Sequence, residues 1–585
     1  MAKRLVIVGG VAAGASAAAK ARRTNEDIEI VLFDAGPYIS FANCGLPYYV
    51  GGEISDRKRL FVTTAERFAR RFHVDVRLHT HVAAIDRPNR TVSVSLPDGA
   101  TEDMPYDRLI LATGTVSLVP PIEGLRRDNV FTVRTVPDAD EILRHLARLV
   151  PAERETVEPE IAAEAPPRAL VIGGGYIGLE MAEQLRRRRL RVTLVEMADQ
   201  LMLALDPEMA EPLRAALVEA GCDVIVGDGV REVVERDGRT RAVTASGREL
   251  PFDLAILAVG VRPNVDLARQ GGIALGRSGA IRADEFQRTS DPAVYAAGDN
   301  CEARHLVLDR PVNIPLAGPA NKAGRVAGAN AALDLAGAPP EDPSRLRFRG
   351  VLGTAVVRVH DKVAAVTGLT ESAARREGIE AAVTYVPAVS HAGYYPGAEQ
   401  MMLKLLSAPG DGRILGAQIV GGRGVDKRLD VLATAITAGM TVEDLEQLDL
   451  GYAPPFGSAR DAVNLAGFVA ANARRGQMPP ITLSELRREL RGDRPPVLID
   501  DRSPREYAAG CMDGAINVPI DELRERLDDV PADRPVVIYC ATGYRSYIAQ
   551  RILANRGRRN VRNLLGGYCL LQQAGAALDD PPDRP

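Results

Sequence analysis

Two stretches of this chain repeat one pattern of apolar and glycine positions. Each begins with a short apolar run, residues 5–8 and 169–172, followed by a glycine-rich turn and a segment with helical periodicity. A second apolar run closes each stretch and ends on an acid, Asp34 in the first and Glu196 in the second. A strand, a glycine turn, a helix and a strand that ends on an acid predict a βαβ unit that binds a dinucleotide.

The two glycine turns differ at one position. The second turn keeps all three glycines of the GxGxxG pattern, Gly173, Gly175 and Gly178. In the first turn, which runs from Gly9 to Gly14, the middle position is Val11. Glycines allow the tight turn and the close approach of a pyrophosphate to the helix N-terminus. Because valine narrows that approach, the first unit is predicted from its whole βαβ context and not from its turn alone.

The terminal acids indicate which nucleotides the units hold. Asp34 can accept hydrogen bonds from ribose hydroxyls. Glu196 would accept a hydrogen bond from the 2'-hydroxyl of NADH and would repel the 2'-phosphate of NADPH. Two such units in one chain predict two dinucleotides, one bound tightly and one exchanging.

The remaining apolar pattern divides the chain further. Short apolar runs end in small residues at Thr113, Gly260 and Asp299, where backbone can approach a ligand closely. From about residue 339 the pattern alternates, which predicts an antiparallel α+β region. The expected strands there are residues 353–359, 363–367, 382–386, 400–406 and 413–419, followed by a helix over 425–438.

The C-terminal region places a cysteine in a short loop after a strand. Residues 535–539 are fully apolar, the loop runs from Cys540 to Arg545, and a helix is expected over residues 546–556. Amide N–H groups at such a strand end and helix start form a positively polarised nest. The nest lowers the pKa of a thiol and stabilises a terminal sulfur anion. A buried, inert cysteine is the alternative.

Composition narrows the function classes. The chain has 585 residues, which is too long for one core. A net charge of −4 argues against nucleic acid or an anionic membrane surface as a partner. No apolar run reaches the ~18 residues that a membrane span needs. Six scattered cysteines without a CxxC pair argue against a zinc site or a disulfide framework, and for a reducing cytoplasm.

One of these cysteines, Cys44, follows the first unit by about ten residues, in a segment that spans residues 40–49. Dithiol reductases of this general shape carry a second cysteine five positions later, where this chain has Tyr49. Cys44 therefore has no neighbour with which to close an internal disulfide. A two-electron cycle must leave it as a mixed disulfide, a persulfide or a sulfenic acid. A buried, inert cysteine is again the alternative.

The sequence of residues 43–49, Asn-Cys-Gly-Leu-Pro-Tyr-Tyr, belongs to a wider resemblance. The first 465 residues or so resemble the single-cysteine branch of the pyridine nucleotide-disulfide oxidoreductases, and residues 43–49 are most similar to the coenzyme A-disulfide reductases within it. Residues 481–575 resemble a rhodanese domain, whose sulfur-carrying loop has the same six-residue length as the loop from Cys540 to Arg545. The fusion resembles the coenzyme A-disulfide reductase/persulfide reductase group.

The resemblance implies an α/β protein with two Rossmann-like dinucleotide-binding domains, an α+β interface domain for homodimerisation and a C-terminal α/β rhodanese domain. The expected boundaries are residues 1–117 and 251–335 for the FAD-binding domain, 118–250 for the NAD(P)H-binding domain, 336–470 for the interface domain, 471–480 for a linker and 481–585 for the rhodanese domain.

The resemblance also implies the site residues. Residues expected to hold FAD are Gly9, Gly14, Asp34, Thr113 and Asp299. Residues expected to hold NADH, with NADPH as a possible substitute, are Gly173, Gly175, Gly178, Glu196 and Gly260. Residues expected to contact coenzyme A are Lys20, Arg23, Ser40, Asn43 and Arg304. The expected catalytic residues are Cys44, Cys540, Arg545 and the two tyrosines that would reach the other subunit's Cys44, Tyr395 and Tyr452. Cys222, Cys301, Cys511 and Cys569 match no motif and are expected to be structural.

These features favour an NADH-dependent, FAD-containing reductase of coenzyme A disulfide, coenzyme A persulfide and polysulfide. Electrons would pass from NADH through FAD to Cys44, and Cys540 would carry sulfane sulfur. A water-forming NADH oxidase, with Cys44 cycling through sulfenic acid, is the first alternative. A sulfur carrier without reductase activity is the second.

Overall fold

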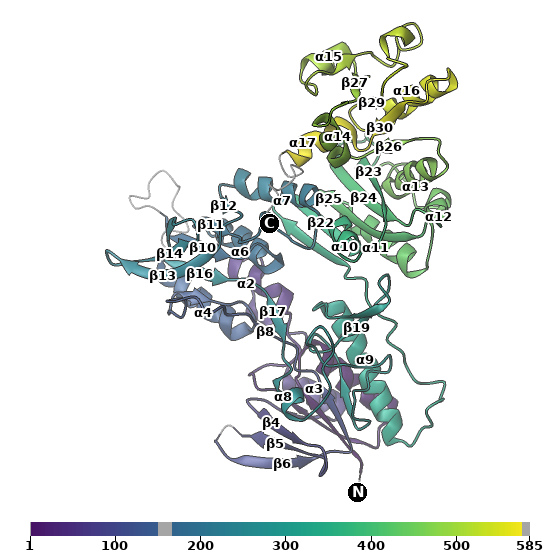
Figure 1. Ribbon diagram of the computed structural model, residues 1–585. Coiled ribbons are helices and arrows are strands. Elements are labelled where there is room, and N and C mark those ends of the chain that lie inside the picture. The colour runs from purple at the N-terminus through teal and green to yellow at the C-terminus, as the bar shows by residue number, and fades with distance from the viewer. Residues whose placement is uncertain (1, 97, 150–165, 576–585) are drawn as a thin grey trace. The chain divides into compact units, whose positions relative to one another are not determined.

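The computed structural model describes residues 2–96, 98–149 and 166–575, which form two compact units (Figure 1). Unit 1 comprises Met1–Met197 and Gly221–Gly353, and unit 2 comprises Ala198–Ala220 and Thr354–Pro585. Most of residues 151–167, expected to be a solvated insertion, and the tail at 579–585, expected to be disordered, lie outside the described residues. Each unit is described by itself.

Unit 1 contains two parallel five-stranded sheets, as the repeated pattern predicts. The first has the order β18-β7-β1-β2-β3. Its strands are β1 (Arg4–Val8), β2 (Glu29–Phe33), β3 (Asp75–Arg77), β7 (Arg108–Leu111) and β18 (Val294–Ala296). The second has the order β12-β11-β10-β16-β9. Its strands are β9 (Val130–Phe131), β10 (Arg168–Ile172), β11 (Arg191–Val195), β12 (Asp223–Ile225) and β16 (Leu254–Leu257).

The long-range pairing of β18 with β7 completes the first sheet, although more than 180 residues separate the two strands. The carboxyl ends of β1, β2, β7 and β18 therefore meet at one edge, where an open α/β sheet binds its ligands. The apolar run that ends near Thr113 spans residues 106–114 and predicts one strand, but the observed strand is shorter. It forms β7 and then, after the turn at Gly114, the separate strand β8 (Thr115–Ser117).

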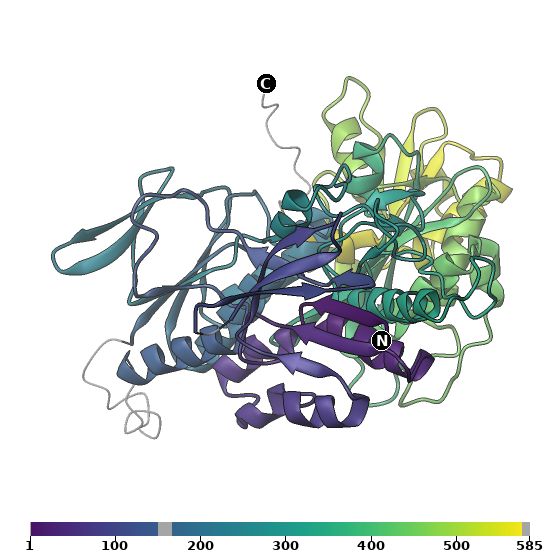
Figure 2. The same ribbon diagram turned by 90° about the horizontal axis from the view of Figure 1, so that it is seen from below.

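Helix α1 (Ala12–Thr24) follows the first glycine turn and packs along α9 (Ala317–Leu335), the teal helix beside the N-terminal segment in Figure 2. Small side chains allow this approach. A Cβ at Gly324 or Gly328 would overlap the backbone of Ala13 or Ala17. The alanine-rich composition of α1 thus serves a close helix–helix contact as well as helix propensity.

Unit 2 contains the expected antiparallel sheet, in the order β21-β22-β25-β24-β23. Its strands are β21 (Ala355–Val359), β22 (Lys362–Gly368), β23 (Ala382–Val389), β24 (Gln400–Ser407) and β25 (Ile414–Gly421). Helices α7 (Pro207–Glu219), α11 (Val425–Thr437) and α13 (Ala462–Arg474) pack against it. Seven of the eight residues of β24, and of β25, are buried, so helices cover both faces of the sheet.

A second sheet of unit 2 is parallel, with the order β26-β30-β29-β27-β28. Its strands are β26 (Pro480–Ile481), β27 (Val497–Asp500), β28 (Ile516–Asn517), β29 (Val536–Tyr539) and β30 (Val561–Leu564). The helices that accompany it are α14 (Leu483–Leu490), α15 (Pro504–Ala508), α16 (Tyr544–Asn555) and α17 (Gly567–Ala574).

The segment between the two sheets corrects the expected linker at residues 471–480. Helix α13 continues through Arg474 with Ala471 fully buried, and Pro480 already belongs to β26. Only residues 475–479 connect the two elements. The alanine-rich pattern of this segment extends the helix that precedes it and does not mark a flexible tether.

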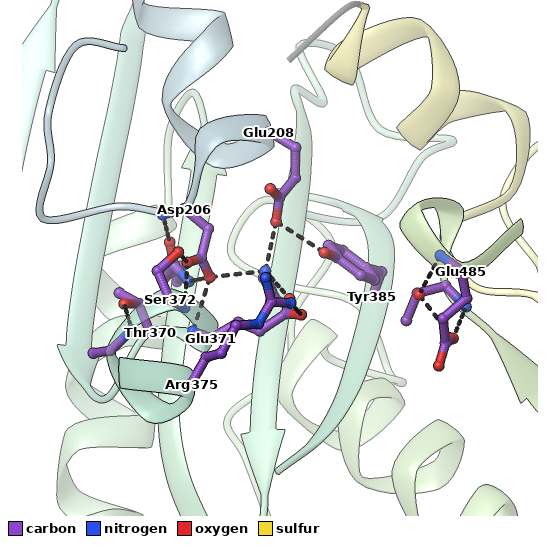
Figure 3. Close-up of polar contacts among 12 residues, drawn as sticks. Asp206, Glu208, Thr370, Glu371, Ser372, Arg375, Tyr385 and Glu485 are labelled. Carbon is purple, nitrogen blue, oxygen red and sulfur yellow. Dashed lines mark hydrogen bonds and ion pairs between the residues drawn. The ribbon is translucent and has the colours of Figure 1, made fainter. Parts of the chain in front are cut away.

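Lys404 on β24 lies at the centre of a buried ionic cluster that holds α7 on the antiparallel sheet, and Figure 3 labels its partners Asp206, Glu208 and Glu371. Its Nζ lies 2.7 Å from Asp206, 2.6 Å from Glu208 and 2.8 Å from Glu371. The Tyr385 hydroxyl donates to Glu208 at 2.8 Å. The three carboxylates could surround a metal ion, but the Lys404 ammonium takes the central position.

The charges in this cluster stabilise one another. Burial would lower the pKa of Lys404, but the oxygens of Tyr385, Glu208, Asp206 and Glu371 raise it well above its usual value. Burial would likewise raise the pKa of Asp206, but Lys404 and Ser372 lower it to about 2. The cluster extends to α17, whose Gln573 donates its side-chain amide to the Glu208 carbonyl at 3.0 Å.

No helix in the described part of the chain is both long and apolar enough to cross a membrane.

Candidate active sites

Each of the two glycine turns of unit 1 donates an equivalent backbone hydrogen bond to the acid at the end of its second strand. In the first fold the Gly10 N–H donates to Asp34 Oδ2 at 2.7 Å, and in the second the Gly174 N–H donates to Glu196 Oε2 at 2.6 Å. Each acid therefore lies at the end of its strand with one oxygen fixed against the glycine turn. Burial raises the pKa of Asp34, although the amides of Gly10 and Gly36 oppose this.

Both turns fit a dinucleotide pyrophosphate. Gly9 and Gly173 have φ values of +102° and +107°, which favour glycine. A Cβ at Gly14 or Gly178 would overlap the carbonyl of Gly9 or Gly173, so each helix begins pressed against its strand. A Cβ at Gly175 would meet no atom within 4 Å, so the second turn leaves open space where a phosphate can approach.

The other expected nucleotide residues follow strand ends. Thr113 follows β7, and its hydroxyl donates to the Asn264 carbonyl at 2.6 Å while accepting from Asn300. Its side chain is thus used within the protein, and its carbonyl accepts from the Asn264 side-chain amide at 3.4 Å. Asp299 follows β18, and burial raises the pKa of its carboxyl. Gly260, three residues after β16, has a φ of +111°.

Cys44 lies in a short 3-10 turn, Asn43–Gly45, that leads into α2 (Leu46–Gly51). Ser40, four residues earlier, donates its N–H to the Gly10 carbonyl at 3.0 Å and has a left-handed φ of +48°. This contact pins the segment to the first glycine turn, so the thiol is delivered beside the first dinucleotide fold. Cys44 is exposed and, like the other five cysteines, forms no disulfide.

The surroundings of Cys44 oppose ionisation of its thiol. Partial desolvation and the carboxylates of Glu180 and Asp299 raise the pKa of Cys44, whereas Arg134 lowers it. Sequence reasoning missed Glu180 and Arg134, which come from other elements of unit 1. Tyr49 stands where dithiol enzymes carry their second cysteine, and its hydroxyl donates to Asp140 at 3.3 Å.

Only part of the expected coenzyme A set is brought together. Lys20 and Arg23 lie on α1, and Arg325 on α9 joins them. Burial, followed by the charges of Arg325 and Arg23, lowers the pKa of Lys20. Arg325 was not predicted, and its place beside Lys20 depends on the contact between α1 and α9. Arg304, by contrast, is paired with Asp309 near its hairpin, β19 (Ala303–His305) and β20 (Arg310–Val312).

Tyr395 and Tyr452 lie in unit 2 with 42% and 49% of their surface exposed. The Tyr452 hydroxyl is hydrogen bonded to Tyr394 at 2.9 Å, whereas Tyr395 packs edge-on against His391. Tyr394 and Phe456 are exposed as well, at 76% and 73%. Four exposed aromatic side chains therefore lie on two neighbouring loops, of which the sequence prediction named two.

Cys540 follows β29 and is fully buried. The Gly543 N–H donates to its Sγ at 3.0 Å, and the Ser546 hydroxyl lies 3.5 Å from the same atom. Gly543 takes a left-handed φ of +94° and starts α16 at Tyr544, two residues earlier than expected. The sulfur thus faces polarised donors at a helix start, as the loop pattern predicted.

Arg545 forms a two-pronged ion pair with Glu506, with N–O distances of 2.8 and 2.7 Å. Glu506 is also the capping-box acid of α15, because its Oε2 accepts from the Ser503 N–H and hydroxyl. Sequence reasoning missed this partner. The spacing Ser-x-x-Glu at residues 503–506 marks the capping box, but nothing local in the sequence links it to Arg545.

Comparisons with known proteins agree with this organisation. The model for pyridine nucleotide-disulphide oxidoreductases matches residues 3–324, that for their dimerisation domain matches residues 354–463, and that for a rhodanese-like domain matches residues 482–574. The chain therefore belongs to the pyridine nucleotide-disulphide oxidoreductase family and carries a C-terminal rhodanese-like domain. Its cofactors are FAD and a nicotinamide dinucleotide.

Among individual proteins, the chain is similar to two solved structures along nearly its whole length. It shares 41% identity with reduced CoADR-RHD of Bacillus anthracis, with a TM-score of 0.90 over 98% of both chains. It shares 38% identity with the NAD-dependent persulfide reductase of A. fulgidus, with a TM-score of 0.86 over 97% of this chain and 99% of that one. It is also 35% identical to the NAD(P)H coenzyme A polysulfide/persulfide reductase of Pyrococcus horikoshii, over 79% of this chain and 97% of that protein.

Proposed function

We propose that this protein is an NADH-dependent reductase of coenzyme A persulfide, polysulfide and coenzyme A disulfide, in which Cys44 is the redox thiol and Cys540 carries sulfane sulfur. The observation that carries the proposal is the environment of Cys44. This exposed thiol is pinned to the first dinucleotide fold and has a tyrosine where a resolving cysteine would lie. The names of the similar proteins support the substrate class.

The chemistry assigned to Cys44 needs no second cysteine. Its thiolate attacks one sulfur of a substrate R–S–S–R', forms a mixed disulfide and releases the other sulfur as a thiolate, which takes up a proton. For a persulfide, attack on the inner sulfur releases hydrosulfide. Two electrons then cleave the mixed disulfide, release the thiol and restore Cys44. FAD, held by the first glycine turn, supplies the two-electron link to NADH.

Coenzyme A suits the cations on α1 and α9. Lys20, Arg23 and Arg325 gather three positive charges in unit 1, which also contains Cys44. A phosphorylated adenosine diphosphate group favours such a cluster. Ser40 and Asn43 flank the thiol and would contact the pantetheine arm. Arg304 would first have to leave Asp309.

We infer a homodimer through the dimerisation domain, in the reducing cytoplasm. The exposed aromatic side chains of Tyr394, Tyr395, Tyr452 and Phe456 supply an apolar surface for a second copy. In that arrangement Tyr395 and Tyr452 would approach the other subunit's Cys44. The domain boundaries given from the sequence, apart from the corrected linker at residues 471–480, belong to the same proposal.

We expect sulfur on Cys540 to reach Cys44 on a small thiol carrier, with coenzyme A persulfide as the shuttle. The experiment that tests the substrate class is the intact mass of the purified, denatured protein with and without reductant. Loss of a coenzyme A moiety on reduction, absent from Cys44→Ser and retained in Cys222→Ser, supports coenzyme A as the partner of Cys44. The same assay set measures NADH oxidation with oxygen alone, and rapid turnover there would favour an NADH oxidase instead.

A further inference from the structure

The charged side chains around the Cys540 loop include more acid than base. Asp501, Glu506 and Arg545 come from three different elements and lie within electrostatic reach of one another. Arg545 is also within reach of Cys540. A third acid, Asp500, is buried and fully paired with Arg502 at 2.7 Å. This excess of acidic side chains bears on which sulfur donors can reach Cys540, and the inference rests on the proposed role of Cys540 as a sulfur carrier.

Arg545 is already neutralised. Both of its terminal nitrogens donate to Glu506, and the capping box of α15 fixes the Glu506 carboxylate from the other side. Hydrogen bonding to Arg545 holds the pKa of Glu506 at about 2, so this carboxylate stays ionised throughout the working range. The only arginine in the loop is therefore paired before any ligand arrives.

Asp501 adds an acid that has no counterpart. It follows β27, its side chain is fully buried, and neither carboxyl oxygen has a hydrogen-bond partner. Both backbone groups of Asp501 are hydrogen bonded: its N–H donates to the Tyr539 carbonyl, and its carbonyl accepts from the Ile520 N–H. Burial of an unpaired carboxyl is costly and raises the pKa of Asp501 to about 8, with Arg545 opposing and Asp500 and Glu506 adding to the shift.

We propose that Asp501, acting with the Glu506–Arg545 pair, makes Cys540 select thiol persulfides and reject sulfur donors in which an oxyanion group is bonded directly to the transferred sulfur. The groups that donate to Sγ are the Gly543 amide and the Ser546 hydroxyl. These neutral donors can hold one sulfur atom, but they do not neutralise a sulfonate near Glu506 and, above about pH 8, near an ionised Asp501.

The transfer step balances with a persulfide alone. The Cys540 thiolate attacks the outer sulfur of R–S–S–H, the Sγ–S bond forms and the S–S bond of the donor breaks. The electron pair of that bond leaves with the inner sulfur as R–S⁻, which takes the proton of the persulfide. With thiosulfate the same step expels the sulfite dianion. Negative charge on Glu506, and on Asp501 once it ionises, disfavours both the entry of thiosulfate and the formation of sulfite.

The test uses the full-length holoenzyme without NADH and measures sulfur loading of Cys540 by intact mass. Glutathione persulfide and thiosulfate are the two donors. At pH 9, where Asp501 is ionised, we expect the second-order rate constant of loading in the unmodified protein to be at least about tenfold higher for the persulfide. Asp501→Asn and Asp501→Val, which remove the charge in different ways, should each raise the thiosulfate-to-persulfide ratio of these rate constants about tenfold at that pH. Asp513→Asn, an exposed acid of the same domain, should leave the ratio unchanged.

A pH profile separates this role from a structural one. The groups that face Asp501 are Arg545 on α16, Glu506 on α15 and the neighbouring Asp500. As Asp501 ionises near pH 8, the ratio should fall further in the unmodified protein but not in Asp501→Asn. Equal loading by both donors, or a ratio unchanged by either Asp501 variant, would overturn the selectivity. If neither donor loads Cys540, the carrier role itself is wrong, and the selectivity is overturned with it.

Discussion

Cys44 and Cys540 occupy opposite kinds of environment. Cys44 is exposed and lies in a 3-10 turn, and partial desolvation together with nearby carboxylates raises its pKa. Cys540 is fully buried at a strand end, and its sulfur faces an amide and a hydroxyl. The Cys44 thiol is open to a large substrate, and its surroundings oppose its ionisation. The other is enclosed by donors that suit a single additional sulfur atom.

The difference indicates how two cysteines in one chain avoid each other's chemistry. An exposed thiol can form a mixed disulfide with a bulky partner, whereas a buried thiol in a six-residue loop can be reached only by the terminal sulfur of a persulfide or polysulfide. The electron-accepting site and the sulfur-carrying site can then be altered separately. Four substitutions, taken from the largest expected effect to the smallest, test that separation.

Cys44→Ser should abolish NADH-dependent reduction of every disulfide and persulfide, by roughly a thousandfold or more, because no second cysteine can replace it. Bound FAD, followed by its visible absorbance, should remain, and sulfur loading of Cys540 should persist. Cys222→Ser, a buried cysteine of the same unit, is the matched control. Reduction near the unmodified rate in Cys44→Ser would contradict the assignment.

Cys540→Ser should abolish sulfur transfer and weaken the reduction of polysulfide and bulky persulfides. Reduction of coenzyme A disulfide should stay within about threefold, since that reaction needs only Cys44 and its cofactors. Steady-state NADH oxidation with each substrate makes the measurement, and Cys511→Ser serves as the control in the same domain. Equal loss of both reactions in a folded protein would show that the two sites are not separate.

Glu196 should affect only the supply of electrons. As an NADH-binding residue, Glu196 would place its carboxylate where a 2'-phosphate would bind, and like charges at ~4 Å repel by about 4 kcal/mol at an effective dielectric of 20. After screening, we expect roughly a 10- to 100-fold preference for NADH in kcat/KM. Glu196→Gln should reduce that preference without changing sulfur loading of Cys540. A higher kcat/KM for NADPH in the unmodified protein would reverse the interpretation.

Glu180→Gln should have the smallest effect, a shift in the ionisation of Cys44. Because Glu180 contributes to the raised pKa of Cys44, removing its charge should lower that pKa and move the pH profile of thiol alkylation to lower pH. At pH 7 the rate should rise about two- to fivefold. Glu141→Gln, an exposed acid on α4 (Val136–Leu149), should leave the profile in place. An unchanged profile in Glu180→Gln would remove Glu180 from the site.

The elements that carry local signals were the predictable ones. Apolar runs predicted the central strands of both parallel sheets of unit 1, but not the short strands β3, β9 and β12. Alternation of apolar and polar residues predicted the antiparallel sheet. The capping box at Ser503 and the loop at Cys540 are also local patterns. Their partners were not predictable, since the Glu506–Arg545 pair and the contact of Lys20 with Arg325 join elements distant in sequence.

Two errors have the same physical origin. The expected linker at residues 471–480 is largely helix and strand, because burial against neighbouring elements extends α13 and recruits Pro480 into β26. The assignment of residues 198–220 to a nucleotide domain did not foresee that they fold with unit 2. Tertiary packing decides such cases, and a single sequence carries no record of it.

The Lys404 cluster also has a consequence for synthesis of the chain. Glu208 leaves the ribosome 196 residues before Lys404 (404 − 208), and 365 residues before Gln573. At a translation rate of ~5–20 residues per second, roughly 10–40 s separate the synthesis of α7 from that of the strand whose Lys404 neutralises its acids. During that interval the apolar face of α7 has no sheet to cover it. The antiparallel region therefore folds late in translation, and a nascent chain arrested before residue 400 should be a substrate for chaperones.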